Sequence, residues 1–338
     1  MSKYVIIGSG IVGLYTAQNL LDKDVDPLEI TVYAEYLPGD QSINYTSPWA
    51  GGNFSCISPD DAQTLQFDKF TYTNLARLRS VLGGDGCGLD NRPTTEFWDF
   101  APDETKISSL SSYLKDYQVL DKSELPDGAV FGIKYTTWNF NCPEFLANFK
   151  THLETKGVRF VRKKLSHVKE AFVDPTTTTV FNCTGIGAKF LKGVEDDKIY
   201  PARGQVVVIK APHINENRLR WGTKDVTYII PRPDSKNQVI LGGYLQAGNW
   251  CADTWEYETK DILKRTIALY PELAHNLEII RVACGLRPSR KGGVRVEKEQ
   301  YSDGKYIVHI SGLSGYGYQA GFGASNLGVQ LSLRDSKL

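Results

Sequence analysis

The sequence has no long apolar run, no excess of charge of either sign, and no cysteine or histidine pattern typical of a metal site. No hydrophobic stretch approaches the ~18 residues that a membrane-spanning helix needs. Lys and Arg together number 39, as do Asp and Glu, so no basic excess favours nucleic acid or an anionic membrane. The cysteines form no C-x-x-C pair and the histidines no H-E-x-x-H motif, so we expect no metal.

Signals for export are also missing. The N-terminus lacks the basic leader of a signal peptide, and we expect none. Because disulfides persist mainly in oxidising compartments, we expect free thiols, with a bridge between Cys251 and Cys284 as an open alternative. A chain of 338 residues, of which 41% are hydrophobic, is long enough for a large core and two domains.

What the sequence does contain is a nucleotide-binding pattern at its start. The apolar run Tyr4–Ile7 predicts a buried parallel strand, and helical spacing follows over about Ile11–Leu21. Between them, Gly8, Gly10 and Gly13 have G-x-G-x-x-G spacing. Gly8 would allow a tight turn, Gly10 the close approach of a pyrophosphate, and Gly13 close packing of the helix on the sheet.

The same pattern places an acid where a ribose would lie. The β-branched run Ile30–Tyr33 leads to Glu35, ~20 residues beyond the glycines, where a carboxylate can accept hydrogen bonds from ribose hydroxyls. The helix N-terminus supplies amide donors for phosphate charge, which adds Ser9, Ile11 and Val12 to the candidate cofactor residues. The alternative is a glycine-rich turn in some other α/β protein.

Two later stretches continue the nucleotide-type pattern. Residues 37–58 are rich in Gly, Pro, Ser and Asn, and predict either a loop around a cofactor or a plain surface loop. A buried strand from residue 179 ends in a T-G-x-G turn that predicts a second crossing against a dinucleotide. The candidate cofactor residues in the rest of the chain before the final helix are Ser42, Gly51, Gly52, Asn53, Leu165, Thr184 and Gly185.

Between these segments the pattern predicts helices and antiparallel strands. Residues 60–82 predict a helix, 226–232 and 238–243 predict a hairpin, and the polar stretch 211–225 predicts an irregular lid. We therefore predict an α/β protein with a Rossmann-type cofactor domain interleaved with a mixed or antiparallel α+β substrate domain. The predicted segments are 1–55, 143–200 and 284–338 for the cofactor domain, and 56–142 and 201–283 for the substrate domain.

Several motifs occur in an order found in one family. They are GSGIVG, SPWAGGN, FNCTGIGA, ARGQ, YIIPRP, LGGYLQAGNW, CGLRPSR and GYGYQAGFG. Through them the chain resembles the D-amino-acid oxidase family, including D-aspartate oxidase, from Tyr4 to Gly323. The resemblance implies non-covalent FAD, hydride transfer from the substrate Cα to flavin N5, and reoxidation by O2 to hydrogen peroxide. The imino acid would then hydrolyse to a 2-oxo acid and ammonia.

The resemblance also implies how a substrate would be held. Arg287 would bind the substrate carboxylate through a planar two-point contact, and Tyr228 would donate its hydroxyl to the same group. The backbone carbonyl of Gly315 would accept a hydrogen bond from the substrate amine. With carboxylate and amine fixed and the Cα–H directed at N5, one enantiomer fits.

The final helix would face the flavin. Gly317, Tyr318 and Gln319 would open it, and its N-terminus would stabilise the negative charge that reduction places near N1 and C2=O. Gln319 would bond to the same edge. The motif stretch 309–315 departs from the family, since an aromatic residue and a second histidine are missing there.

Substrate charge is predicted from Leu245. Relatives that oxidise aspartate place an arginine near this position, and leucine cannot pair a second carboxylate, so neutral D-amino acids are expected. Arg218, Arg220 or Lys224 on the expected lid would leave D-aspartate as an alternative. The nucleotide-type pattern by itself would also suit a non-catalytic nucleotide-binding protein of the same fold or a nicotinamide-linked dehydrogenase.

The last three residues, Ser336-Lys337-Leu338, match a peroxisomal targeting signal. We expect a peroxisomal import receptor to bind them and the protein to reside in the peroxisome matrix, whereas the alternative is an ordinary polar tail. A homodimer is a further expectation.

Overall fold

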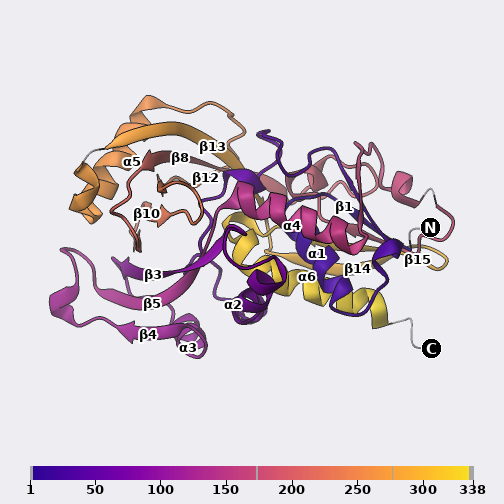
Figure 1. Ribbon diagram of the computed structural model, residues 1–338, viewed down its shortest axis with the longest axis horizontal. Helices are drawn as coiled ribbons and strands as arrows, with labels where there is room; N and C mark the ends of the chain where they lie inside the picture. Colours follow the sequence, from indigo (N-terminus) through magenta and orange to yellow (C-terminus); the bar gives the residue numbers. More distant parts are fainter. Residues whose placement is uncertain (1–2, 173, 276, 335–338) are drawn as a thin grey trace.

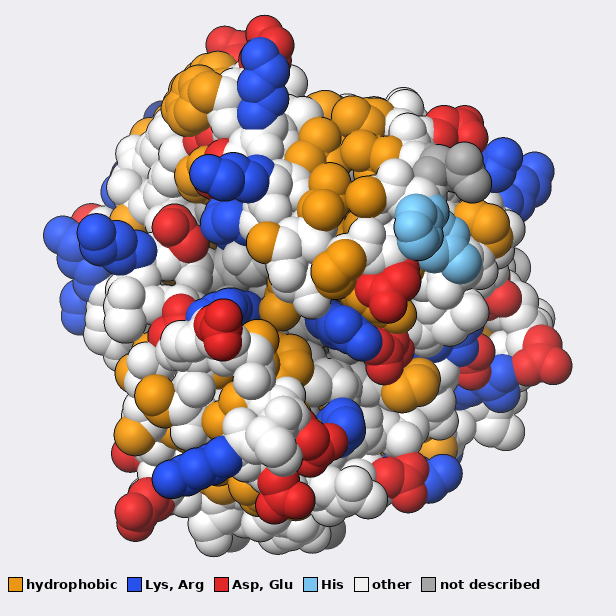
Figure 2. Space-filling model, turned by 90° about the vertical axis from the view of Figure 1, so that its left-hand side faces the viewer, with side chains coloured by type: hydrophobic (Ala, Val, Ile, Leu, Met, Phe, Trp, Pro, Cys, Tyr) orange, Lys and Arg blue, Asp and Glu red, His pale blue; other side chains and the backbone are white. Residues whose placement is uncertain are grey.

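In the computed structural model, two β-sheets lie side by side along the long axis, with helices packed mainly around the first (Figure 1). The structure describes residues 3–172, 174–275 and 277–334, so Ser336–Leu338 lie outside the described residues. The end that carries the second sheet shows basic and acidic side chains interspersed over its surface (Figure 2). Among the described residues, no helix is both long and apolar enough to span a membrane.

The first sheet has the parallel topology that the N-terminal pattern predicts. Its strand order is β14-β15-β7-β1-β2-β6, and all neighbours are parallel except β14 and β15. The strands are β1 (Tyr4–Ile7), β2 (Ile30–Ala34), β6 (Arg159–Arg162), β7 (Thr179–Asn182), β14 (Arg295–Ser302) and β15 (Lys305–Ser311). Ile7 pairs with Tyr33 of β2 and with Asn182 of β7, so three strands end at one edge. Ligands of parallel sheets bind at this edge.

Helices α1 (Ile11–Leu21) and α6 (Gly317–Leu333) pack on this sheet, α4 (Cys142–Lys156) packs on α1, and α2 (Ala62–Val81) packs on α6. Buried aromatic rings join them, since Tyr15 of α1 contacts Phe149 of α4 and Phe322 of α6 at centroid distances of 5.9 and 5.0 Å. The helix predicted at 60–82 is confirmed, and Asp61 caps it by accepting a hydrogen bond from the Thr64 amide at 2.9 Å.

The second sheet has nine strands in the order β12-β8-β11-β10-β9-β3-β5-β4, with β13 also paired to β8. Its strands are β3 (Leu89–Trp98), β4 (Lys115–Val119), β5 (Phe131–Phe140), β8 (Ile199–Lys210), β9 (Asn217–Trp221), β10 (Val226–Pro231), β11 (Gln238–Gly242), β12 (Gln246–Ala247) and β13 (Glu278–Arg290). The predicted hairpin is confirmed as β10 and β11. Helix α5 (Glu256–Leu269) packs on this sheet, and α3 (Glu104–Ser111) packs on α2.

The predicted lid at 211–225 is wrong in its structure, because β9 runs through it as an interior strand. β9 pairs with β10 on one side and with β3 on the other. Leu219 is buried apolar, and Asn217 is buried but satisfied by hydrogen bonds to Thr94 and Asn139, both at 2.8 Å. Arg218 and Arg220 make the stretch look polar, but they alternate with the buried Asn217 and Leu219, as successive residues of a strand do.

The predicted domain segments stay a prediction, and the packing crosses two of their boundaries. Helix α2 packs on α6, although residues 56–142 were predicted for the substrate domain. Strand β13 continues in the second sheet to Arg290, past the predicted boundary at residue 284. The interleaving itself is visible in the sheets, since each is assembled from segments far apart in the sequence.

Candidate active site

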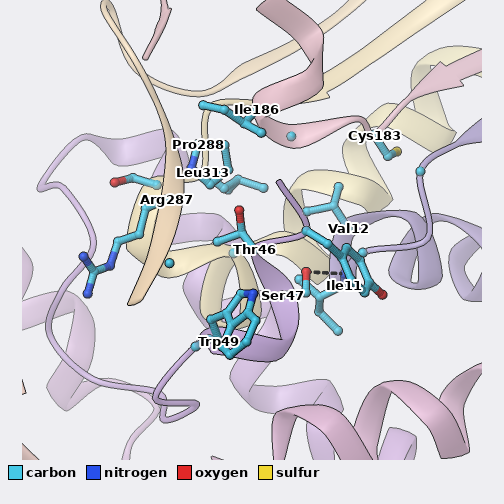
Figure 3. A pocket seen from close by; sticks show the side chains of 18 of the residues that line it. Ile11, Val12, Thr46, Ser47, Trp49, Cys183, Ile186, Arg287, Pro288 and Leu313 are labelled. Carbon is cyan, nitrogen blue, oxygen red and sulfur yellow. Dashed lines mark hydrogen bonds between the residues drawn. The ribbon is translucent and has the colours of Figure 1, made fainter. Parts of the chain in front are cut away.

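A cavity of about 670 Å³ is lined by residues of both sheets and of the loop 44–57. This volume is in the range of ligand and cofactor sites. One end lies at the first glycine turn, where Ile11 and Val12 point into it, and Arg287 lies at the other end (Figure 3). Thr46 lies between them in the same view. The cavity therefore joins the predicted cofactor and substrate residues in one space.

The glycine turn has the geometry that the spacing predicts. Gly8 has a φ of +107°, and a Cβ there would collide with the carbonyl oxygen of Cys183. A Cβ on Gly13 would collide with the carbonyl oxygen of Gly8, which is why helix and turn can approach so closely. Gly13 itself is not a lining residue, so its contribution is to hold the turn in shape.

The loop 44–57 is packed onto this turn. Ser47 accepts a hydrogen bond from the Ile11 amide at 3.0 Å, drawn as a dashed line in Figure 3. The Tyr45 hydroxyl donates to the carbonyl of Ser9 at 2.9 Å, and a Cβ on Gly10 would lie 2.9 Å from the Ser47 hydroxyl. Of the two alternatives for this stretch, the structure favours the cofactor loop.

The remaining predicted cofactor residues mostly border the same end. Glu35 directly follows β2, lines the cavity and pairs with Lys164 at 2.8 Å. Thr184 and Gly185 line it after β7, and Leu165 lines it after β6. Ser42 does not line it; its carbonyl instead accepts a hydrogen bond from the Trp49 indole at 2.8 Å.

The residues present fit a flavin nucleotide. Two buried polar atoms of lining residues, Asn53 Nδ2 and Ser311 Oγ, have no hydrogen-bond partner among the described residues. Such atoms are costly when nothing pairs them, which favours a polar ligand against them. Gly51 and Gly52 line the cavity and let their loop pack closely on the second sheet. Gly52 has a φ of +79°, and a Cβ there would lie 2.6 Å from the carbonyl oxygen of Phe140. Ser311 was not predicted as a site residue, since a lone serine at the end of a strand carries no signal.

At the opposite end, the structure brings Arg287 and Tyr228 together. Arg287 Nη1 donates to the carbonyl of Tyr244 at 2.9 Å, and Nη2 lies 3.5 Å from the Tyr228 hydroxyl. A guanidinium has five N–H donors, so further donors remain for a carboxylate. Each of the two side chains packs against a glycine of a neighbouring strand. A Cβ on Gly204 would collide with Arg287, and a Cβ on Gly242 would collide with Tyr228.

The N-terminus of α6 borders the cavity through Gly315, Gly317 and Tyr318, as predicted. Gly315 adjoins Arg287: a Cβ there would lie 3.3 Å from Arg287 Cδ. Gln319 lines the cavity as well, although its side-chain amide is hydrogen-bonded to protein groups, and its bond to the flavin edge stays a prediction.

The hydrogen-bond partners of the Gln319 side chain lie on helix α2, in the loop 44–57 and just after this loop. Its Nε2 donates to Ser58 and Asp68 at 2.8 Å each, and its Oε1 accepts from the Ser55 amide at 2.9 Å. Burial raises the pKa of Asp68 to about 7, while the hydrogen bonds from Gln319 and Ser58 oppose the rise. Gln319 therefore ties the first turn of α6 to α2 and to this loop.

Leu245 is 63% exposed and does not line the cavity, so it is not the residue that faces a substrate side chain, and the preference for neutral D-amino acids stays a prediction. The lining itself gives a better argument about substrate charge. Its cationic residues are Lys163, Lys164, Lys192 and Arg287. The lysines lie beside the first sheet, and Arg287 stands alone among Tyr228 and apolar side chains of the second. Arg218 and Arg220 pair with Glu216 and Asp99 instead.

Comparison with known proteins agrees with this geometry. Residues 3–331 match the family described as FAD dependent oxidoreductase. A D-amino-acid oxidase of Schizosaccharomyces pombe is 44% identical over 341 residues, covering 99% of this chain and 97% of that relative. A D-amino-acid oxidase of Fusarium vanettenii is 31% identical, covering 97% and 95%. A D-aspartate oxidase of Talaromyces thermophilus is 28% identical, covering 95% and 92%.

Solved structures share the fold. The L-proline dehydrogenase from P. horikoshii superposes with a TM-score of 0.77 at 15% identity, covering 100% of this chain and 94% of that one. At this identity the likeness concerns the fold alone.

Proposed function

Because the chain belongs to the FAD-dependent oxidoreductase family, we propose that it is a D-amino-acid oxidase for neutral substrates, producing a 2-oxo acid, ammonia and hydrogen peroxide. The observation that carries this proposal is one cavity with a dinucleotide turn at one end and Arg287 beside Tyr228 at the other. We take the parallel sheet to be a Rossmann-type cofactor domain.

The chain's own residues would hold FAD along the cavity. The first amides of α1 lack carbonyl partners within the helix; that of Ile11 donates to Ser47, and those that follow suit the pyrophosphate. Glu35 suits a ribose. Asn53 Nδ2 and Ser311 Oγ are polar atoms left for the rest of the cofactor. When bound, FAD accepts the substrate electrons and passes them to O2.

The substrate would be oriented by three groups. Arg287 and Tyr228 would donate to its α-carboxylate, and the carbonyl of Gly315, next to Arg287, would accept from its amine. A substrate fixed at both groups has its Cα–H direction set, and such positioning supplies much of the rate enhancement. Apolar side chains such as Leu219, Val226 and Ile230 line this end of the cavity.

Substrate charge is tested by an anaerobic titration of the purified holoenzyme. We expect D-alanine to bleach the flavin absorption and L-alanine to leave it unchanged. D-aspartate should react at least about tenfold less efficiently than D-alanine, because its second carboxylate meets no cation near Arg287.

Three results would each point to a different protein. Faster reaction with D-aspartate would make it a D-aspartate oxidase like its Talaromyces relative. A yellow protein that no D-amino acid bleaches would be a non-catalytic binder, and a colourless one would exclude FAD.

We further propose that the terminal Ser336-Lys337-Leu338 directs the protein to peroxisomes, where peroxide-forming oxidases are housed. Deleting these three residues should leave kcat/KM for D-alanine unchanged in vitro but move a fluorescently tagged protein from peroxisomes to the cytosol. Unchanged localisation would contradict the proposal. The homodimer stays a prediction.

A further inference from the structure

The side-chain end of the cavity is built on a row of neighbouring strands. From β13 the order across the sheet is β8, β11, β10, β9 and β3, each step about 4.8 Å. Arg287 lies on β13 and reaches across β8 toward Tyr228 on β10. Paired residues share a face, so Leu219 lies beside Tyr228, and Trp221 lies beside Val226. All of these side chains line the cavity.

The neighbouring strand β3 carries a buried acid that does not line the cavity. Glu96 is paired with Leu219 and is 0% exposed. Its carboxylate accepts a hydrogen bond from the Trp221 indole at 2.6 Å, another from the Cys56 amide at 3.2 Å, and one from the Tyr135 hydroxyl.

The indole of Trp221 is held in one orientation by these contacts. Its Nε1 is bound to Glu96, and its ring stacks on Trp98 at a centroid distance of 6.4 Å. Glu96 also holds Cys56, whose neighbours Ser55 and Ile57 both line the cavity. Glu96 thus holds in place both Trp221 of β9 and the part of the loop 44–57 that lines this end of the cavity.

We propose that Trp221 determines substrate specificity by closing the side-chain end of the cavity and shielding the carboxylate of Glu96 from it. Glu96 acts as a positioning residue for this indole. The inference rests on the proposed function and adds the substrate class: D-amino acids with short, uncharged side chains. Longer chains collide with the indole, and cationic ones cannot reach the acid behind it.

The test compares two substrates with the same four-carbon side chain, D-norleucine and D-lysine, of which D-lysine adds a terminal ammonium; D-alanine is the reference. In Trp221→Ala, kcat/KM for D-norleucine relative to D-alanine should rise at least about tenfold, because the wall recedes. The ratio of D-lysine to D-norleucine should also rise about tenfold, because the ammonium can then pair with Glu96. In the double variant Trp221→Ala/Glu96→Gln, the second gain should vanish while the first remains.

Two further variants serve as controls. Trp221→Leu should give a smaller gain for D-norleucine in the same direction, and it remains informative if the alanine variant fails to fold. Glu96→Gln alone keeps an oxygen that can accept the hydrogen bond from the indole, so the indole should still separate residue 96 from the substrate. The ratio of D-lysine to D-norleucine should therefore stay unchanged.

The outcomes that overturn the inference are distinct from failure of the proposed function. An unchanged D-norleucine ratio in folded Trp221→Ala or Trp221→Leu would show that the indole is not the wall. A D-lysine gain that survives Glu96→Gln would show that the acid is not what the wall shields. If the wild type oxidises no D-amino acid, the proposed function is wrong. Binding of D-norleucine is then measured by anaerobic calorimetry. If Trp221→Ala does not bind D-norleucine more tightly than the wild type does, the inference is wrong as well.

Discussion

Replacing Arg287 with alanine should lower kcat/KM for D-alanine by roughly 10³-fold, while FAD stays bound and the thermal unfolding temperature changes little. Removing one partner of a desolvated charge pair costs about 2–5 kcal/mol, and each 1.4 kcal/mol is about tenfold in an equilibrium constant. Most of the loss should fall on KM, because the carboxylate is bound before as well as during the reaction. Steady-state peroxide release and the flavin spectrum together measure this.

Two matched variants make the result specific. Arg287→Lys keeps the charge but loses the planar two-point contact, so it should recover only part of the activity. Arg218→Ala removes an arginine that pairs with Glu216 and lies over the Tyr270 ring at 3.7 Å, outside the cavity lining. It should leave kcat/KM within about twofold, as an uninvolved surface substitution does. Near-normal kinetics in Arg287→Ala would show that the Arg287 guanidinium does not bind the substrate carboxylate.

Replacing Gly13 with alanine should weaken FAD binding by roughly 10²-fold, since overpacking costs about 1–3 kcal/mol or more and shifts the turn that receives the phosphates. The added Cβ would meet the carbonyl oxygen of Gly8, a backbone atom that cannot move aside alone. Alanine favours a helix over glycine by about 1 kcal/mol, so local propensity predicts the opposite sign. FAD content after purification and FAD titration of the apoprotein measure the effect.

Gly187→Ala is the matched control. Its Cβ would meet nothing closer than Thr184 Cβ at 3.5 Å, which is an ordinary contact. Because Gly187 lines the cavity, the comparison uses the thermal unfolding temperature of the apoprotein, which Gly13→Ala should lower and Gly187→Ala should leave nearly unchanged. Full FAD content in Gly13→Ala would show that the turn tolerates the shift.

The residues that the sequence identified share one property: their signals are local or belong to a motif. The strand, the glycine spacing and helix α1 lie within the first residues, and Glu35 follows at the expected distance. Arg287 and Tyr228 were found through the resemblance carried by GLRP and YIIP. The structure shows what the motifs could not, namely that Gly204 and Gly242 leave room for these two side chains.

The errors have a common physical origin. β9 looked like an irregular lid because one of its two partners, β3, comes from a distant part of the sequence, although the other, β10, follows it directly. The partners of the Gln319 amide, among them Asp68 of α2, were likewise not visible in the sequence. Leu245 seemed to face the substrate, and only the course of the chain after β11 shows it exposed.

The sequence by itself determined the α/β class and the dinucleotide turn, and it singled out the pair that we propose to bind the carboxylate, because these depend on short-range geometry and on motif residues. The tertiary structure decided which polar groups are left for a ligand and which are already paired. It also decided that Trp221 and Glu96 meet at the end of the cavity. Burial and pairing are properties of segments brought together from distant parts of the chain, and no local pattern in this sequence specifies them.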